Sequence, residues 1–155
     1  MSDPAPPRLV FAFSLHIKVA APLVIGDVPG GLRRVVPIMG GTVEGPRLRG
    51  RVLPGGADIQ IIRPDGLTGI TARYVIEAGD GALITVENTG LRRGPPEAMA
   101  KILRGEAVDP ALIYFRTAPR FETGAPAHAW LMRGLFVATA ERHPEHVAIA
   151  VFEVL

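Results

Sequence analysis

Apolar and polar residues alternate along several short stretches of the chain, and turn-forming residues separate these stretches. The clearest of them is 8–19. If it forms a strand, its large apolar side chains share one face: Phe11, Phe13, Leu15, Ile17 and Val19. A period of two residues is typical of a strand with one buried face. We therefore predict a long first strand here.

A second alternating pattern predicts a β-hairpin. Residues 70–78 and 82–89 are joined by the sequence Gly-Asp-Gly, and an Asp-Gly step supplies the backbone conformation that a tight hairpin needs. On the first arm, Ala72, Tyr74 and Ile76 share one face. We predict that Tyr74 points into the protein.

Shorter runs complete the expected set of strands, at 23–25, 35–39, 112–117, 130–139 and 147–155. Within the central segment 40–66, we interpret Gly40-Gly41, Gly55-Gly56 and Asp65-Gly66 as turns between further short strands. Residues 118–129 are predicted to form an irregular loop. Pro95 or Pro96 at the start of the segment 95–104 and Gly105 just after it favour one short helix there.

Glycine and proline punctuate the whole chain, with 18 and 15 copies that form no low-complexity block. Many turns at short spacing favour an all-β fold. We predict a closed or nearly closed antiparallel β-barrel with one short helix. The length of 155 residues fits a single domain over 1–155, with 1–7 as a flexible N-terminal arm.

Composition restricts the functional classes. The sequence has no cysteine, which excludes thiolate metal sites and a cysteine nucleophile, and no nucleotide-binding or serine-hydrolase motif occurs. His143 and His146 have a weak metal-ligand spacing, but Pro144 lies between them, so we interpret them as solvated turn residues. We expect no metal and no cofactor.

Charge and hydropathy restrict the partners. The net charge is only +2, and the arginine pairs Arg33-Arg34 and Arg92-Arg93 are interpreted as solvated turn residues, so we expect no nucleic acid. The start MSDPAPPRL is unlike a signal peptide, and no apolar run is long enough to span a membrane. We expect a cytoplasmic protein that does not bind membranes.

One acid–amide pair marks a candidate ligand pocket. Asp58 and Gln60 share a strand face directly after a Gly-Gly turn, in an apolar neighbourhood. The remaining candidates are polar or aromatic side chains that we expect either to point into the barrel or to lie at its open end. They are Tyr74, Arg116, Glu122, His128 and Trp130.

These residues suit acid–base chemistry. Asp58 or His128 would be the base, with Tyr74 as a further catalytic group, while Gln60, Arg116, Glu122 and Trp130 would bind the ligand. An alternative stands beside this interpretation: Asp58 and Arg116 form an internal ion pair that only closes the barrel.

Several ordered motifs resemble a bacterial family known as domain of unknown function 3237, or uncharacterised protein family 0311. They are GGTVEGPRLRG, VLPGGADIQIIRPDG, ARYVIEAGDGALITVENTG, YFRTAPRFETGAP and the AWL that starts at Ala129. The resemblance implies a calycin-like (lipocalin-like) barrel and a small homo-oligomer, with a dimer favoured. Three positions depart from the family pattern: Ile59 replaces an aromatic residue, His128 a tyrosine and Met132 an asparagine.

Two functional hypotheses follow. The first is a metal-free acid–base enzyme, of isomerase, lyase or hydrolase type, acting on a small and largely apolar carbonyl compound. The second is a non-catalytic protein that uses the same pocket as a carrier or sensor of a small molecule. An assembly module with arginine-rich loops is a weaker third hypothesis.

Overall fold

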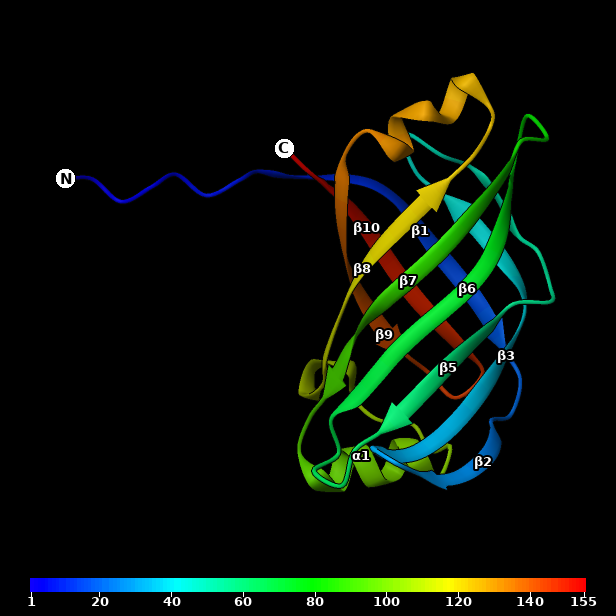
Figure 1. Ribbon diagram of the computed structural model, residues 1–155, viewed down its shortest axis with the longest axis vertical. Coiled ribbons are helices and arrows are strands. Elements are labelled where there is room, and N and C mark those ends of the chain that lie inside the picture. Colours follow the sequence, from blue (N-terminus) through cyan, green and yellow to red (C-terminus); the bar gives the residue numbers. More distant parts are fainter.

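A computed structural model describes residues 1–155 as one antiparallel sheet of ten strands that closes into a barrel (Figure 1). The strands are β1 Leu9–Val19, β2 Leu23–Val28, β3 Gly31–Glu44, β4 Gly50–Val52, β5 Ala57–Ile62, β6 Thr68–Ala78, β7 Leu83–Arg93, β8 Tyr114–Glu122, β9 Leu135–Arg142 and β10 His146–Val154. The helices are α1 Pro96–Leu103 and the 3₁₀ turns η1 Pro110–Leu112 and η2 Pro126–Met132. None of these helices is long and apolar enough to cross a membrane.

The barrel closes because β1 pairs on both of its edges. The order β1-β10-β9-β8-β7-β6-β4-β3 returns to β1 through the β1–β3 ladder. β5 follows β4 in the same gap between β3 and β6, and β2 extends the sheet from the far end of β3. The predicted fold class, a closed antiparallel barrel with one short α-helix, is confirmed.

A bulge in β1 changes which side chains of this strand face the barrel interior. The β1–β10 register shifts between Phe11 and Phe13, so Ala12 and Phe13 are both fully buried. Phe11 is 40% exposed and packs edge-on against Phe152 outside the barrel, with ring centroids 5.8 Å apart. Placing Phe11 on the inner face was therefore wrong, because the extra residue reverses the alternation at this point.

Gly40 and Gly41 form no turn; they lie inside β3. Gly40 has φ +128° at the register shift where β3 passes β1. At Gly41, a Cβ would lie 2.2 Å from the backbone oxygen of His16 on β1. The predicted turn was wrong because a bulge and a close approach of two strands select glycine for the same reasons as a turn.

We expect Gly41→Ala to lower the free energy of unfolding by about 1–3 kcal/mol, because the new methyl group pushes β3 away from β1 at the barrel closure. Chemical denaturation measures the difference. Gly124→Ala is the matched control, since nothing lies within 4 Å of a Cβ at that exposed position. Equal stability of the two variants would contradict the close approach described here.

Other local predictions are confirmed. The β6–β7 hairpin turns at Gly81, which has φ +87°, and Tyr74 is only 5% exposed. The predicted helix is α1, and Gly55 and Gly66 have positive φ in turns. Two boundaries were wrong: residues 118–122 continue β8, and Trp130 belongs to η2 and not to a strand.

The two ends of the barrel are filled differently. At the end covered by η2, aromatic rings pack edge to face, with Phe121 5.7 Å from Phe13 and 5.3 Å from Phe136 between ring centroids. The opposite end lies beside α1, at the bottom of Figure 1, where Ile102 of the helix is buried. Aromatic side chains therefore fill the barrel interior near η2, and the space for a cavity lies near α1.

Candidate functional site

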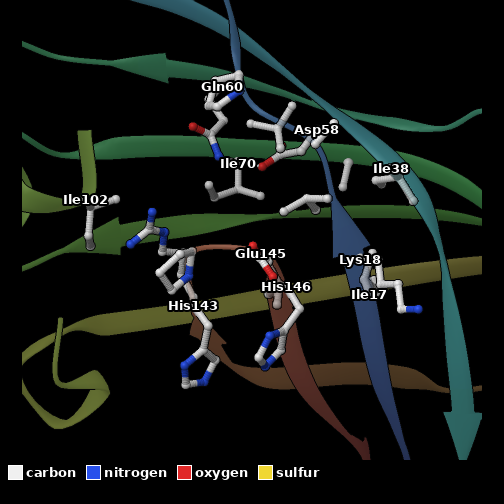
Figure 2. A pocket seen from close by; sticks show the side chains of 18 of the residues that line it. Ile17, Lys18, Ile38, Asp58, Gln60, Ile70, Ile102, His143, Glu145 and His146 are labelled. Carbon is white, nitrogen blue, oxygen red and sulfur yellow. Dashed lines mark hydrogen bonds between the residues drawn. The ribbon is translucent and has the colours of Figure 1, made fainter. Parts of the chain in front are cut away.

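A cavity of about 910 Å³ occupies the barrel end beside α1. This volume is within the range of sites for drug-sized molecules. Its apolar wall comes from inward-facing side chains on several strands, including Val36, Ile38, Ile70, Phe115 and Ile149. Figure 2 shows Asp58 and Gln60 across the cavity from His143 and His146.

Asp58 and Gln60 enter the cavity from β5. The strand pairs with β3 and β6, and its alternation turns Ile59 outward, where it is 45% exposed. The Asp58 carboxylate accepts hydrogen bonds from the backbone N–H of Thr71 at 3.1 Å and from Gln60 Nε2 at 2.8 Å. Gln60 Oε1 in turn accepts one from Arg34 Nη2 at 3.1 Å. An amide therefore links the acid to a guanidinium.

Two buried arginines, Arg34 on β3 and Arg92 on β7, complete the polar wall. They are 5% and 3% exposed, and neither forms a salt bridge with Asp58. The prediction that both arginine pairs are solvated was wrong for one member of each. Successive residues of a strand face opposite sides, so one arginine of a pair inside a strand has to face inward. The shared face of Arg34 with Val36 and Ile38 was the available signal.

Burial dominates the electrostatics of this wall. It raises the pKa of Asp58, although hydrogen bonds from Gln60 and Thr71 act in the opposite direction. Burial also lowers the pKa of Arg92 to about 10, and the positive charge of Arg34 adds to that effect. The pKa of Tyr74 is raised by burial, so its hydroxyl stays protonated and can donate a hydrogen bond.

Several polar atoms on the wall have no hydrogen-bond partner in the protein. They are Arg34 Nε, Arg92 Nε, Tyr74 Oη, Asn88 Oδ1 and Thr117 Oγ1. All five side chains line the cavity. Buried polar groups are normally paired, so these atoms are open to hydrogen bonds with water or another molecule in the cavity.

Three imidazoles stack at the cavity edge. The ring of His146 lies 4.2 Å from that of His16 and 4.5 Å from that of His143, between centroids. Burial, His16 and His143 all lower the pKa of His146. The stacked rings face one another, and no group of three or more His, Asp or Glu side chains is placed to hold a metal ion.

Comparison with known proteins places the chain in a family. The model of the family described as "Protein of unknown function (DUF3237)" matches residues 7–154. The chain belongs to the DUF3237 family. The resemblance inferred from its motifs is thereby confirmed.

Relatives of this DUF3237 chain share its whole length. A UPF0311 protein of Rhodopseudomonas palustris is 49% identical over 145 residues, which cover 94% of this chain and 95% of the relative. A solved structure from the same species, described as a conserved protein of unknown function, has a TM-score of 0.95 at 47% identity and covers 99% and 100% of the two chains. A protein with unknown function from Clostridium acetobutylicum has a TM-score of 0.90 at 41% identity, with coverage of 99% and 100%.

A fungal protein is a more distant relative. The hydroalkoxylation enzyme phnH of Penicillium herquei is 31% identical over 85 residues, or 55% of this chain and 56% of the fungal one. A solved structure of an enzyme from Penicillium herquei has a TM-score of 0.75 at 22% identity, over 100% and 99% of the chains. At that identity the superposition shows a shared fold only.

Other predicted site residues of this DUF3237 chain lie away from the cavity. Arg116 is exposed and donates to the backbone oxygen of Phe115, so the alternative of an interior ion pair with Asp58 was wrong. Glu122 is exposed at the end of β8. The structure thus brings together Asp58, Gln60 and Tyr74 of the predicted set.

His128 and Trp130 also lie elsewhere, because residues 118–122 continue β8 and carry the chain to the η2 end. His128 Nε2 is 2.8 Å from Asp80 Oδ2, and Trp130 is half-buried with Arg47 Cζ 3.7 Å from its ring centroid. The three departures from the family pattern, at Ile59, His128 and Met132, do not line the cavity either.

Proposed function

We propose that this protein is an acid–base enzyme that moves a proton within a small, largely apolar molecule carrying an oxygen function. The observation that supports this most is Asp58: a carboxylate in the wall of an otherwise apolar cavity, oriented by two hydrogen bonds, whose pKa burial raises. A carboxylate of raised pKa is a stronger base than an exposed one, which suits proton abstraction near neutral pH.

The proposed step needs no group beyond this wall. Asp58 accepts a proton from an O–H or an activated C–H bond of the substrate. Arg92 and the Tyr74 hydroxyl donate hydrogen bonds to the oxygen on which negative charge develops. In an isomerisation the double bond shifts, and the protonated Asp58 returns the proton to another carbon of the same molecule. In an addition the deprotonated oxygen forms a bond to one carbon of the double bond, and the other carbon takes the proton from Asp58. The net reaction is an isomerisation or an addition across a double bond, with no change in oxidation state and no lost atoms.

The fungal relative supports the same class of chemistry. Hydroalkoxylation adds an O–H across a carbon–carbon double bond, so a proton moves from oxygen to carbon. That activity belongs to a protein that is 31% identical to this chain over 85 residues. For the present chain it favours addition or isomerisation over hydrolysis, within the set of acid–base reactions that the residues allow.

2-Allylphenol in D₂O tests the proposal. Addition of the phenol O–D across the double bond gives 2-methyl-2,3-dihydrobenzofuran with one deuterium on carbon. Isomerisation gives 2-propenylphenol, without deuterium where Asp58 returns the proton that it took and with one deuterium where that proton first exchanges with solvent. Gas chromatography with mass spectrometry separates both products from the probe and counts the deuterium. We expect one of these products with the wild-type protein, and none above background with Asp58→Asn. A probe that stabilises the protein in a thermal melt but is returned unchanged and without deuterium would support the carrier function instead.

A further inference from the structure

The cavity end near α1 carries an excess of positive charge. Arg34, Arg92 and Arg142 all line it, and the carboxylates beside them are the partly buried Asp58 and the exposed Glu145. Burial lowers the pKa of both Arg92 and Arg142, and the positive charge of Arg34 lowers both further, so the guanidinium groups repel one another across this space. Counting only the nearly fully buried cations, Arg34 and Arg92, against Asp58 leaves one uncompensated positive charge.

Arg92 is the least satisfied of these groups. Its side chain is 3% exposed, Nε has no hydrogen-bond partner, and no salt bridge involves it. Its neighbour is the Phe115 ring, whose centroid is 5.4 Å from Cζ. A guanidinium offers five donors in a planar fork, and burying it without acceptors is costly.

The alternation of β7 explains how Arg92 reaches this position. Asn88 and Arg92 face inward from the same strand, and Thr117 of neighbouring β8 faces inward beside them, opposite Gly90. Asn88 Oδ1 and Thr117 Oγ1 are unpaired as well. Unpaired polar atoms on adjacent strands therefore surround the guanidinium, while Phe115, Ile70 and Ile149 supply the apolar remainder of the wall.

We infer that the ligand of this cavity is a monoanion with an apolar body, whose negative group binds Arg92 and the free Nε of Arg34. The inference rests on the proposed function and narrows its substrate to a carboxylate that also carries the O–H or C–H bond from which Asp58 takes the proton. One negative charge balances the excess left by the two buried arginines and Asp58. Arginine pairs with planar oxyanions through two parallel hydrogen bonds, which satisfies the donors that the protein leaves free.

Two probes of the same shape test the charge. 8-Anilinonaphthalene-1-sulfonate (ANS) and N-phenyl-1-naphthylamine share their ring system, but only the first carries an anionic group. Both report binding by fluorescence. We expect the wild-type protein to bind ANS at least ~10-fold more tightly than the neutral amine, because a hydrogen-bonded charge contributes about 1.5–3 kcal/mol and 1.4 kcal/mol is tenfold.

The variant Arg92→Met tests whether the anionic group of the probe binds at Arg92. We expect this variant to lose ~10-fold or more in ANS affinity while it binds the neutral amine as the wild type does. Arg120→Met removes the same charge from an exposed position on β8 and should leave both affinities unchanged. A thermal melt without probe shows that each variant is folded.

Three results would contradict the inference of an anionic ligand. Equal affinity of the two probes for the wild type, no measurable ANS binding, or an equal loss of both probes in Arg92→Met would each overturn the anionic class. Asp58→Asn separates this inference from the proposed function: it removes a negative charge from the wall and should tighten ANS binding while abolishing turnover. Arg92-dependent ANS binding together with undiminished turnover in Asp58→Asn would leave the anion site standing and refute the catalytic role.

Discussion

Asp58→Asn is expected to reduce the turnover of the phenol probe by ~100-fold or more, since a removed general base typically costs that much, and to lower the free energy of unfolding by no more than about 1 kcal/mol. The substitution keeps the shape of the side chain and an acceptor oxygen for the Thr71 N–H, and it loses the acceptor for Gln60 Nε2. Burial raises the pKa of Asp58 even though Gln60, Thr71, Arg92 and Arg34 all act to lower it. The environment therefore disfavours the ionised form on balance, and a neutral amide should be tolerated.

The raised pKa of Asp58 determines how both the turnover and the stability should depend on pH. For a base, kcat/KM rises as pH increases through the pKa of Asp58, which lies above the ordinary value of about 3.9, and Asp58→Asn lacks this step. For stability, a raised pKa means that the contribution of Asp58 is complete below the unfolded-state pKa and is lost as pH rises through the folded-state pKa. Between these two pKa values, the free energy of unfolding of Asp58→Asn should therefore rise relative to that of the wild type.

Chemical denaturation between about pH 4 and pH 7 and rate measurements over the same range check these expectations. Asp27→Asn, at an exposed carboxylate on β2, is the matched control and should change neither profile. A large loss of stability in Asp58→Asn with turnover retained would show that the carboxylate is structural.

Arg92→Met is expected to raise the free energy of unfolding by about 1–3 kcal/mol, because burying a charged group that has no salt-bridge partner carries a desolvation penalty of several kcal/mol, of which the lost attraction to Asp58 offsets a part. Asp58 attracts Arg92, but the two form no salt bridge, and burial outweighs that attraction in setting the lowered pKa of Arg92. Asp58 keeps its hydrogen bonds to Gln60 and Thr71 in the variant.

Denaturation without added ligand measures this gain, and Arg120→Met should lie within about 0.5 kcal/mol of the wild type, as for most surface substitutions. A variant that is more stable but binds its ligand less well would show that the wild-type protein gives up stability for function at this position. A clear loss of stability in Arg92→Met would instead assign Arg92 a structural role.

The sequence patterns sufficed for the barrel, the hairpin, the helix and the inward faces of Asp58, Gln60 and Tyr74, because each depends on a period of two or on a local turn signal. They failed where one residue changes the phase. The bulge beside Phe11 reverses a face, and Gly40 marks a bulge that has the same residue preference as a turn.

The arginines were misassigned for a related reason. Each buried arginine, Arg34 or Arg92, has an adjacent arginine that faces outward, and an Arg-Arg pair is usually solvated. Arg116 was placed inside although Phe115, Thr117 and Phe121 already define the inner face of β8 with a period of two. The register of that strand became clear only once residues 118–122 were known to continue it.

The pairing of β1 with β10 has a consequence for how the chain folds. The first strand made is held on one edge by the last, from Leu9 opposite Val154 to Lys18 opposite His146, and reciprocal backbone bonds join Arg8 to Leu155. Contacts so distant in sequence slow folding, because a long loop must be ordered before they form. During synthesis β1 therefore waits with one edge unpaired until β10 emerges, and folding can finish only after translation of the last strand.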